Sequence, residues 1–312
     1  MSKHQREKVD AMLRRPRPEG PPPSVEELRA GFAALMSAMV VPSGFRSSAM
    51  TLGDRPALSV EPEQGARPGQ TILYFHGGGN VYGSPEAVLP LTAQVVARTG
   101  IRAFSPDYRQ APEHPFPAAI EDTLSAYRAL LDDGTDPSAI VFVGDSAGGG
   151  LTVTTCLAAR DAGLPLPAAI VAFSPGLDAT RTGASMDTKA GVDPILTRAS
   201  VERTGAMYLA GQDPHQPLLS PAVLADLTGF PPMLLQVGTN EVMLDDSVRL
   251  AQRARDADVD VILDVTAGVP HVFQSFAGGV LDEADQALDR AALFIRQHLG
   301  TPSTVTVRGG DN

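Results

Sequence analysis

The chain has 312 residues, 43% of them hydrophobic, and a formal net charge of −11 at pH 7. This length suits one large α/β domain or two small ones, and because nothing resembles a linker or a repeat, we expect one. The negative charge argues against a nucleic-acid partner, which needs a basic face. No apolar stretch approaches the roughly 18 residues of a membrane span, and residues 1–10 lack a secretory signal, so we expect a cytoplasmic protein.

The N-terminal region contains a proline-rich stretch and then a helical pattern. Residues 1–23 are charged and then rich in proline, which favours an extended or mobile arm. Ser24 and Glu27 have the spacing of a capping box, and apolar residues recur at helical spacing from Val25 to Met39. We expect two short N-terminal helices ahead of the sheet, which either cover its carboxyl edge as part of a lid or simply pack on the body of the domain.

From Thr71 onward the chain alternates between strand and helix patterns. Apolar strands are predicted at 71–75, 101–104, 139–143, 168–173, 233–237 and 261–265. Amphipathic helices are predicted near 86–99, 117–132, 147–162, 245–257 and 282–299. This alternation predicts a parallel sheet covered by helices on both faces, with the site on the loops at the carboxyl ends of its strands.

The most informative motif lies between the strand 139–143 and the helix that follows it. Residues 144–148 read Gly-Asp-Ser-Ala-Gly, and a strand that turns sharply into a helix through Gly-x-Ser-x-Gly is a nucleophile elbow. The glycines permit the tight turn. The turn lifts the Ser146 hydroxyl above the sheet, at a helix N-terminus whose amides can stabilise an oxyanion.

Two further motifs lie at the ends of predicted strands. Residues 76–79 read His-Gly-Gly-Gly, a loop that supplies the other half of an oxyanion hole when it precedes a nucleophile elbow. Glu241 follows the strand 233–237, and His271 follows the strand 261–265. The order serine, acid, histidine is that of α/β-hydrolases and differs from the two other common serine-triad orders.

Other candidate residues have simpler interpretations. His76 belongs to the glycine loop, so a structural hydrogen bond is preferred to a role as the base. Asp245 and Asp246 are rivals for the acid, but they lie where the next helix should begin and fit cap residues better. Cys156, the single cysteine, has apolar neighbours and is expected to be a buried packing residue. The six histidines lack metal-ligand spacing, so we predict no metal.

The segment 178–220 interrupts the alternation, because it is longer than the single crossover helix expected there. We predict an insertion that forms the rest of a lid, with Met186, Met207 and Tyr208 as candidate pocket residues. Packing within the lid is the alternative use of these side chains. The predicted organisation is therefore an arm and lid helices at 1–50, a catalytic domain at 51–300 and a disordered tail at 301–312.

Together with residues 107–118 (Asp-Tyr-Arg-Gln-Ala-Pro-Glu-His-Pro-Phe-Pro-Ala), the motifs at 76–79 and 144–149 resemble the bacterial hormone-sensitive-lipase-like branch of the α/β-hydrolases. The resemblance extends from about residue 25 to 299. It implies an α/β-hydrolase fold with a mostly parallel central sheet of about eight strands, helices on both faces and a helical lid.

The resemblance also implies a role for individual residues. Ser146 corresponds to the nucleophile and His271 to the general base. Glu241 stands at the third triad position, which in the family is usually the aspartate of an Asp-Pro-Leu sequence and here begins Glu-Val-Met. A glutamate reaches one methylene further, yet it can still orient the imidazole. The implied oxyanion donors are the amides of three residues, Gly78, Gly79 and Ala147.

The expected function is that of a serine carboxylesterase, without a cofactor, that hydrolyses short-chain acyl esters or compact lactones through an acyl-enzyme. An amide-cleaving N-acetyl hydrolase with the same triad and a non-catalytic small-ligand binding protein are the alternatives. The presence of both Ser146 and His271 argues against the binding protein. Oligomerisation through the last strand and helix is common in the family, which makes a homodimer an expectation. The predicted substrate-binding residues are Asn80, Tyr82, Asp145, Met186, Met207, Tyr208 and Val272.

Overall fold

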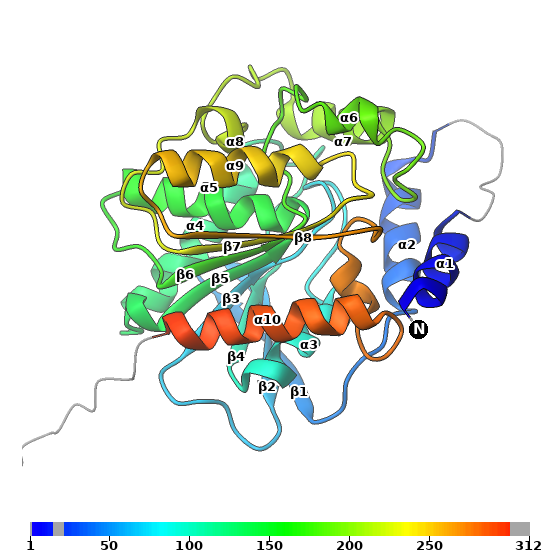
Figure 1. Cartoon of the computed structure of the whole chain (residues 1–312). Helices are drawn as coiled ribbons and strands as arrows, with labels where there is room; N and C mark the ends of the chain where they lie inside the picture. The colour runs from blue at the N-terminus through cyan, green and yellow to red at the C-terminus, as the bar shows by residue number, and fades with distance from the viewer. Residues whose placement is uncertain (1, 15–21, 300–312) are drawn as a thin grey trace, which may run out of the picture.

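The computed structural model describes residues 2–14 and 22–299, and its centre is an eight-stranded sheet in the order β1-β2-β4-β3-β5-β6-β7-β8 (Figure 1). The strands are β1 (Phe45–Leu52), β2 (Arg55–Pro62), β3 (Thr71–Phe75), β4 (Arg102–Pro106), β5 (Ile140–Asp145), β6 (Ala169–Phe173), β7 (Met233–Gly238) and β8 (Val261–Thr266). β2 pairs antiparallel with β1 and β4, and the remaining pairs are parallel. The predicted mostly parallel sheet is confirmed.

Helices cover both faces of this sheet (Figure 1). Because successive side chains of a strand point to opposite faces, Ile72 and Tyr74 of β3 join one hydrophobic core, whereas Leu73 and Phe75 join the other. The first core includes side chains of α3 (Leu89–Thr99) and α10 (Asp282–His298). The second includes side chains of α4 (Ala118–Asp132), α5 (Ala147–Asp161), α8 (Pro221–Leu224) and α9 (Leu244–Asp256).

The hairpin of β1 and β2 is not predicted by apolar runs in the sequence. Most residues of β1 are exposed, so its sequence contains no continuous apolar run. The turn between the strands contains Gly53, whose φ is 59°, a conformation that favours glycine. Backbone pairing with β2, rather than burial of its own side chains, places β1 at the edge of the sheet.

The N-terminal residues form a helix where an extended arm was predicted. α1 (Ser2–Leu13) buries Val9, and the guanidinium of Arg14 donates to the carbonyl oxygens of Gly191 and Val192. These contacts with distant parts of the chain stabilise a helix that the composition of residues 1–23 does not predict. The proline-rich part of the predicted arm at 15–21 and the predicted tail at 301–312 lie outside the described residues.

α2 (Val25–Met36) begins at the predicted capping box: the Glu27 amide donates to Ser24 Oγ at 3.2 Å, and the Ser24 amide donates to the Glu27 carboxylate at 2.7 Å. The insertion between β6 and β7 contributes α6 (Ser185–Thr188) and α7 (Arg198–Leu209), which lie on the same side of the molecule as α2 (Figure 1). No helix in the ranges that the structure covers is both long and apolar enough to cross a membrane.

Candidate active site

Ser146 lies at the sharp turn between β5 and α5. Its φ is 53° and its ψ is −120°, a conformation in which side-chain-bearing residues are strained. A Cβ on Gly144 would lie 2.4 Å from the carbonyl oxygen of Gly148, and a Cβ on Gly148 would lie 2.0 Å from that of Phe75. Both glycines are therefore required by close backbone approach, as the elbow motif predicts.

Ser146, His271 and Glu241 form one hydrogen-bonded chain. Nε2 of His271 lies 2.8 Å from Ser146 Oγ, and Nδ1 lies 2.8 Å from Glu241 Oε2. Both His271 and Glu241 are buried. Since Nδ1 faces a carboxylate, the proton of the neutral ring belongs on Nδ1, which leaves Nε2 as the acceptor for the serine proton. The three residues that the sequence suggested are thus brought into the order a serine nucleophile needs.

A second serine holds the acid in position. Glu241 Oε1 accepts hydrogen bonds from the Ser174 hydroxyl at 2.8 Å and from the Gly238 amide. Ser174 Oγ in turn accepts from the Val272 amide at 3.0 Å, next to the histidine. Sequence reasoning missed Ser174; its position directly after the predicted strand 168–173 was the available signal. It is a positioning residue that couples the acid to the histidine loop.

The surroundings of His271 favour its protonated form. Burial acts to lower the pKa of the imidazole, but the hydrogen bond and negative charge of Glu241, with smaller contributions from Asp193 and Asp145, outweigh it and raise the pKa above the ordinary histidine value. An imidazolium at this position is therefore stabilised.

The two rival acids have other partners. Asp245 and Asp246 lie in the first turn of α9, and Asp246 Oδ2 accepts from the amides of Leu177 at 2.7 Å and Asp178 at 3.0 Å. Asp245 accepts from the Ser185 amide at 2.9 Å. Both carboxylates hold the start of the insertion instead of capping the helix N-terminus, and Glu241 faces the histidine.

The glycine loop after β3 is held in a conformation that depends on its lack of side chains. Gly78 and Gly79 have φ values of 125° and 63°, and a Cβ on Gly78 would lie 1.9 Å from the Tyr82 carbonyl oxygen. Ala147 is the first residue of α5, so its amide has no partner within the helix. Gly79, Ala147 and Ser146 line one cavity, which suits the predicted oxyanion donors.

Asp145, a predicted substrate-binding residue, supports this loop. Its buried carboxylate accepts from the Tyr74 hydroxyl at 2.9 Å and from the Gly77 amide. Burial raises the pKa of Asp145 to about 6, against the opposing effect of these hydrogen bonds. The side chain therefore ties the glycine loop to the elbow, and it also borders a cavity beside Ser146.

His76 has the predicted structural surroundings. Its Nδ1 lies 2.8 Å from the Gly77 carbonyl oxygen, and its ring stacks on Tyr108 with centroids 4.2 Å apart. Burial lowers the pKa of His76 to about 4, so the ring is neutral at physiological pH.

Cys156 is buried in α5, as expected for a packing residue. Among the residues described, no three His, Cys, Asp or Glu side chains come together as a metal ligand set.

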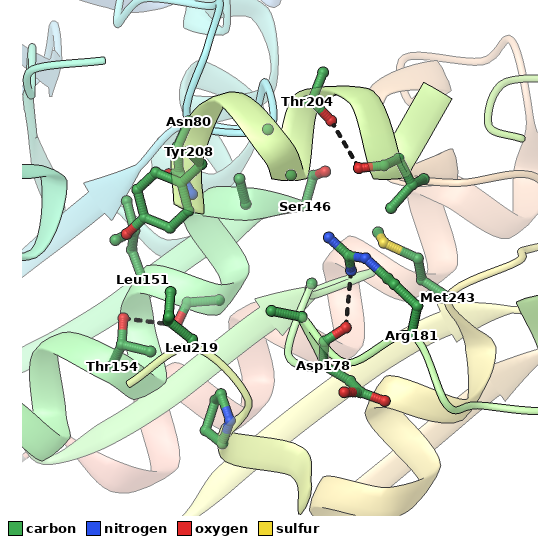
Figure 2. Close-up of a pocket in the computed structure, with 18 of the residues that line it drawn as sticks. Asn80, Ser146, Leu151, Thr154, Asp178, Arg181, Thr204, Tyr208, Leu219 and Met243 are labelled. Atoms are coloured by element: carbon green, nitrogen blue, oxygen red, sulfur yellow. Dashed lines mark hydrogen bonds between the residues drawn. The ribbon is translucent and has the colours of Figure 1, made fainter. Parts of the chain in front are cut away.

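Two cavities meet at Ser146. The first has a volume of about 110 Å³ and is lined by the predicted residues Asn80, Tyr82 and Tyr208. Asn80 and Tyr208 can be followed in Figure 2. Other walls come from α5, from the insertion and from the segment between β7 and α9. The residues concerned are Leu151, Thr154, Asp178, Arg181, Leu196, Val201, Thr204, Leu218, Leu219 and Met243.

The second cavity has a volume of about 100 Å³ and is the one that His271 lines, together with the predicted residues Tyr82, Asp145 and Val272. Its apolar walls come mainly from three segments: α2 with the residues next to it, the insertion, and the segment after His271. The apolar residues are Phe32, Leu35, Met36, Met39, Ile195, Leu196 and Phe276.

Comparison with known proteins agrees with this geometry. A family model described as the alpha/beta hydrolase fold matches residues 72–275. The crystal structure of an esterase from the bacterial hormone-sensitive lipase family superposes with a TM-score of 0.90 at 41% identity, over 95% of this chain and 99% of that one. The chain belongs to this family of α/β-hydrolases.

Relatives of the hydrolase have names that agree with the family. An acetyl-hydrolase from Streptomyces hygroscopicus is 41% identical over 251 residues, covering 80% of this chain and 83% of that protein. An esterase from Acinetobacter venetianus is 35% identical over 226 residues, covering 72% of this chain and 74% of that protein.

Two predicted pocket residues of the hydrolase lie outside both cavities. Met186 is buried among Val201, Val242 and Met243, so its side chain packs between the insertion and the segment after β7 instead of facing a substrate. Met207 is half-buried on α7 and lines neither cavity. The sulfur that borders the first cavity belongs to Met243, whose position after Glu241 did not suggest a pocket.

Proposed function

We propose that this ester hydrolase is a serine carboxylesterase that hydrolyses short-chain acyl esters or compact lactones through an acyl-enzyme. The observation that carries the proposal is the Ser146–His271–Glu241 chain, with both contacts of the histidine at 2.8 Å. In this arrangement a serine hydroxyl can transfer its proton as it attacks a carbonyl carbon. The α/β-hydrolase family and the esterase relatives also support it, and they set aside the non-catalytic ligand-binding alternative.

The reaction follows from the positions of the groups. His271 Nε2 takes the proton of Ser146 as Oγ forms a bond to the carbonyl carbon. The carbonyl oxygen becomes an oxyanion that the amides of Gly78, Gly79 and Ala147 stabilise, and losing one such donor typically costs about 10²–10³ in rate. The tetrahedral intermediate expels the alcohol, which receives the proton from His271. Water then attacks the acyl-enzyme by the same route and releases the acid.

The two cavities suit the two parts of an ester. The departing alcohol must lie next to His271, which lines the second cavity and not the first. We therefore assign the leaving group to the second cavity and the acyl group to the first. A cavity of about 110 Å³ suits an acyl chain of a few carbons. We interpret α2 and the insertion as the lid, because both supply walls of the second cavity.

Initial rates on p-nitrophenyl acetate, butyrate, octanoate and palmitate test this proposal, with Ser146→Ala as the matched variant. We expect activity to peak at acetate or butyrate and to disappear in the variant. A panel of small lactones follows with the same pair of proteins. Folded protein that turns over none of these substrates would refute the esterase function, and so would activity that Ser146→Ala retains.

N-acetyl amide cleavage is a second candidate, because His271, which contacts both Ser146 and Glu241, can also give its proton to an amine leaving group. An amine leaves only after protonation, and the imidazolium formed when Ser146 loses its proton can supply that proton. The name of the Streptomyces relative agrees with acetyl as the transferred group. Comparison of p-nitrophenyl acetate with p-nitroacetanilide separates the two functions, because an esterase leaves the anilide intact.

We also propose that the protein forms a homodimer through β8 and α10. β8 is an edge strand of the sheet, and Ile262 and Val265 on it are 52% and 43% exposed. Leu293 on α10 is 51% exposed. Light scattering of the wild type and of Ile262→Lys checks this, and a monomeric wild type would rule the dimer out. Cytoplasmic location stays a prediction of the sequence.

A further inference from the structure

Arg181 lines the first cavity from the loop that follows β6. Its φ is 54°, a backbone conformation that residues with a side chain rarely adopt, and it turns the backbone where the insertion begins. Figure 2 shows the guanidinium directed into the space below Ser146. Gly205 of α7 leaves room for it, because a Cβ there would lie 3.2 Å from Arg181 Nη2. The guanidinium therefore belongs to the wall of the cavity that contains the nucleophile.

The charge of Arg181 has no direct partner. Nη1 donates to the backbone carbonyl oxygen of Asp178 at 2.9 Å, which uses one of the five N–H groups of a guanidinium. Within the described part of the chain Arg181 forms no ion pair. The Asp178 carboxylate instead pairs with Arg249 at 3.1 Å and points away from Arg181, as Figure 2 shows. It also accepts hydrogen bonds from Thr180 and Thr182.

The buried carboxyl group of Asp246 interacts with the charge of Arg181 from a distance and does not contact it. Asp246 is buried, and its Oδ2 accepts two backbone amides. Burial raises its pKa to about 7, although the charge of Arg181 acts in the opposite direction. Among the described residues, no carboxylate is in contact with the Arg181 guanidinium, which therefore remains available to a group that enters the first cavity.

We propose that Arg181 makes this enzyme selective for esters whose acyl group ends in a carboxylate, namely half-esters of short dicarboxylic acids. The inference rests on the proposed function, because it needs an ester whose acyl part occupies the first cavity. An arginine binds a carboxylate through charge-assisted, often bidentate hydrogen bonds, which are about twice as strong as those between neutral groups. The free N–H groups of Arg181 are the donors.

The test compares pairs of ethyl esters that differ only in the terminal group. Monoethyl succinate and monoethyl glutarate carry the carboxylate, and ethyl 4-methylpentanoate and ethyl 5-methylhexanoate replace it with an isopropyl group of similar shape. A pH-stat measures kcat/KM for each ester with the wild type, Arg181→Gln and Arg181→Lys. Arg198→Gln, at an exposed arginine in the same insertion, is the control for loss of one positive charge.

We expect the wild type to prefer a half-ester over its neutral counterpart. The ratio of the two kcat/KM values should fall about tenfold to a hundredfold in Arg181→Gln, which is the usual effect of losing a hydrogen bond to a charged group. It should stay within threefold in Arg198→Gln, and Arg181→Lys should keep part of the preference. An unchanged ratio in Arg181→Gln overturns the proposal.

Two measurements separate this inference from the proposed function and from misfolding. If the wild type hydrolyses p-nitrophenyl acetate but prefers both neutral esters, the selectivity is wrong and the esterase function stands, whatever the variants do. If it hydrolyses none of the esters, the proposed function fails and this inference fails with it. Thermal melting of Arg181→Gln shows whether that variant is folded. If Arg181→Gln does not fold, Arg181→Lys takes its place. A ratio of half-ester to neutral-ester kcat/KM below one in Arg181→Lys then also refutes the proposal.

Discussion

Replacing Glu241 with glutamine tests the most specific feature of the site. The glutamate Oε1 accepts from Ser174 and Gly238, so a glutamine is expected to place its amide oxygen there. Its NH₂ group then takes the position of Oε2, 2.8 Å from Nδ1 of His271. Because that group is a donor, Nδ1 must act as an acceptor, and the ring proton moves to Nε2. His271 then presents a proton to Ser146 instead of a lone pair.

The expected loss is large because the base is in the wrong tautomer. In serine proteases the same exchange at the acid lowers kcat by about 10⁴, which corresponds to roughly 5.5 kcal/mol of activation free energy. We expect kcat of Glu241→Gln on p-nitrophenyl acetate to fall by about 10³–10⁴. Glu241→Asp keeps the charge but shortens the side chain by one methylene, and we expect about a 10²-fold loss from misplacement.

The pH profile gives a second readout of Glu241→Gln. Glu241 raises the pKa of His271 against the lowering effect of burial, so removing its charge leaves burial dominant. The acid limb of kcat/KM should therefore move to lower pH in the variant. Thermal melting confirms that each protein is folded. Retention of activity within tenfold in Glu241→Gln, or an acid limb that moves to higher pH, would refute this account of the site.

Three further predictions concern the base, the elbow and the lid. In the wild type His271 must be neutral to act as the base, and its pKa is raised. We therefore expect kcat/KM to fall on acidification with a midpoint above pH 6.5, the ordinary histidine value. A midpoint below pH 6.5 would contradict this prediction. Gly148→Ala places a Cβ 2.0 Å from the Phe75 carbonyl oxygen, so we expect at least about 1–3 kcal/mol lost in denaturant unfolding and about a 10²-fold loss of activity. Gly31→Ala, a helical glycine with nothing within 4 Å of the added Cβ, is the matched control and should raise stability by up to about 1 kcal/mol. Glu113→Gln breaks the ion pair of Glu113 with Arg29 at 2.7 Å and leaves the hydrogen bonds of Arg29 to the Val81 and Ala111 carbonyl oxygens in place. It should lower global stability by less than about 1 kcal/mol, yet speed hydrogen exchange in α2; equal exchange rates would show that the pair does not hold the helix.

Local patterns in the sequence were sufficient for the parts of this protein that depend on neighbours in the chain. The tight turn at Ser146 needs glycines at 144 and 148, and the alternation of apolar runs and helical patterns predicts the parallel part of the sheet. Three motifs at strand ends imply one shared edge, because parallel strands end together. The capping box at Ser24 is likewise a local signal, and the structure contains it.

Other features depended on contacts between segments far apart in the chain, and the tertiary structure alone decided them. Glu241 faces His271 while Asp245 and Asp246 bind the insertion, although all three lie in one short acidic stretch. The hairpin β1–β2 is held by pairing and not by apolar burial, so its sequence has no strong pattern.

The same limit applies to the walls of the cavities. Met186 and Arg181 are five residues apart in the insertion, yet Met186 packs against the segment after β7 and Arg181 lines the same cavity as Ser146. A residue type and its spacing tell how a chain folds locally. Which side chains surround a cavity is set by how the insertion packs on the sheet, and that packing brings together residues that no local pattern connects.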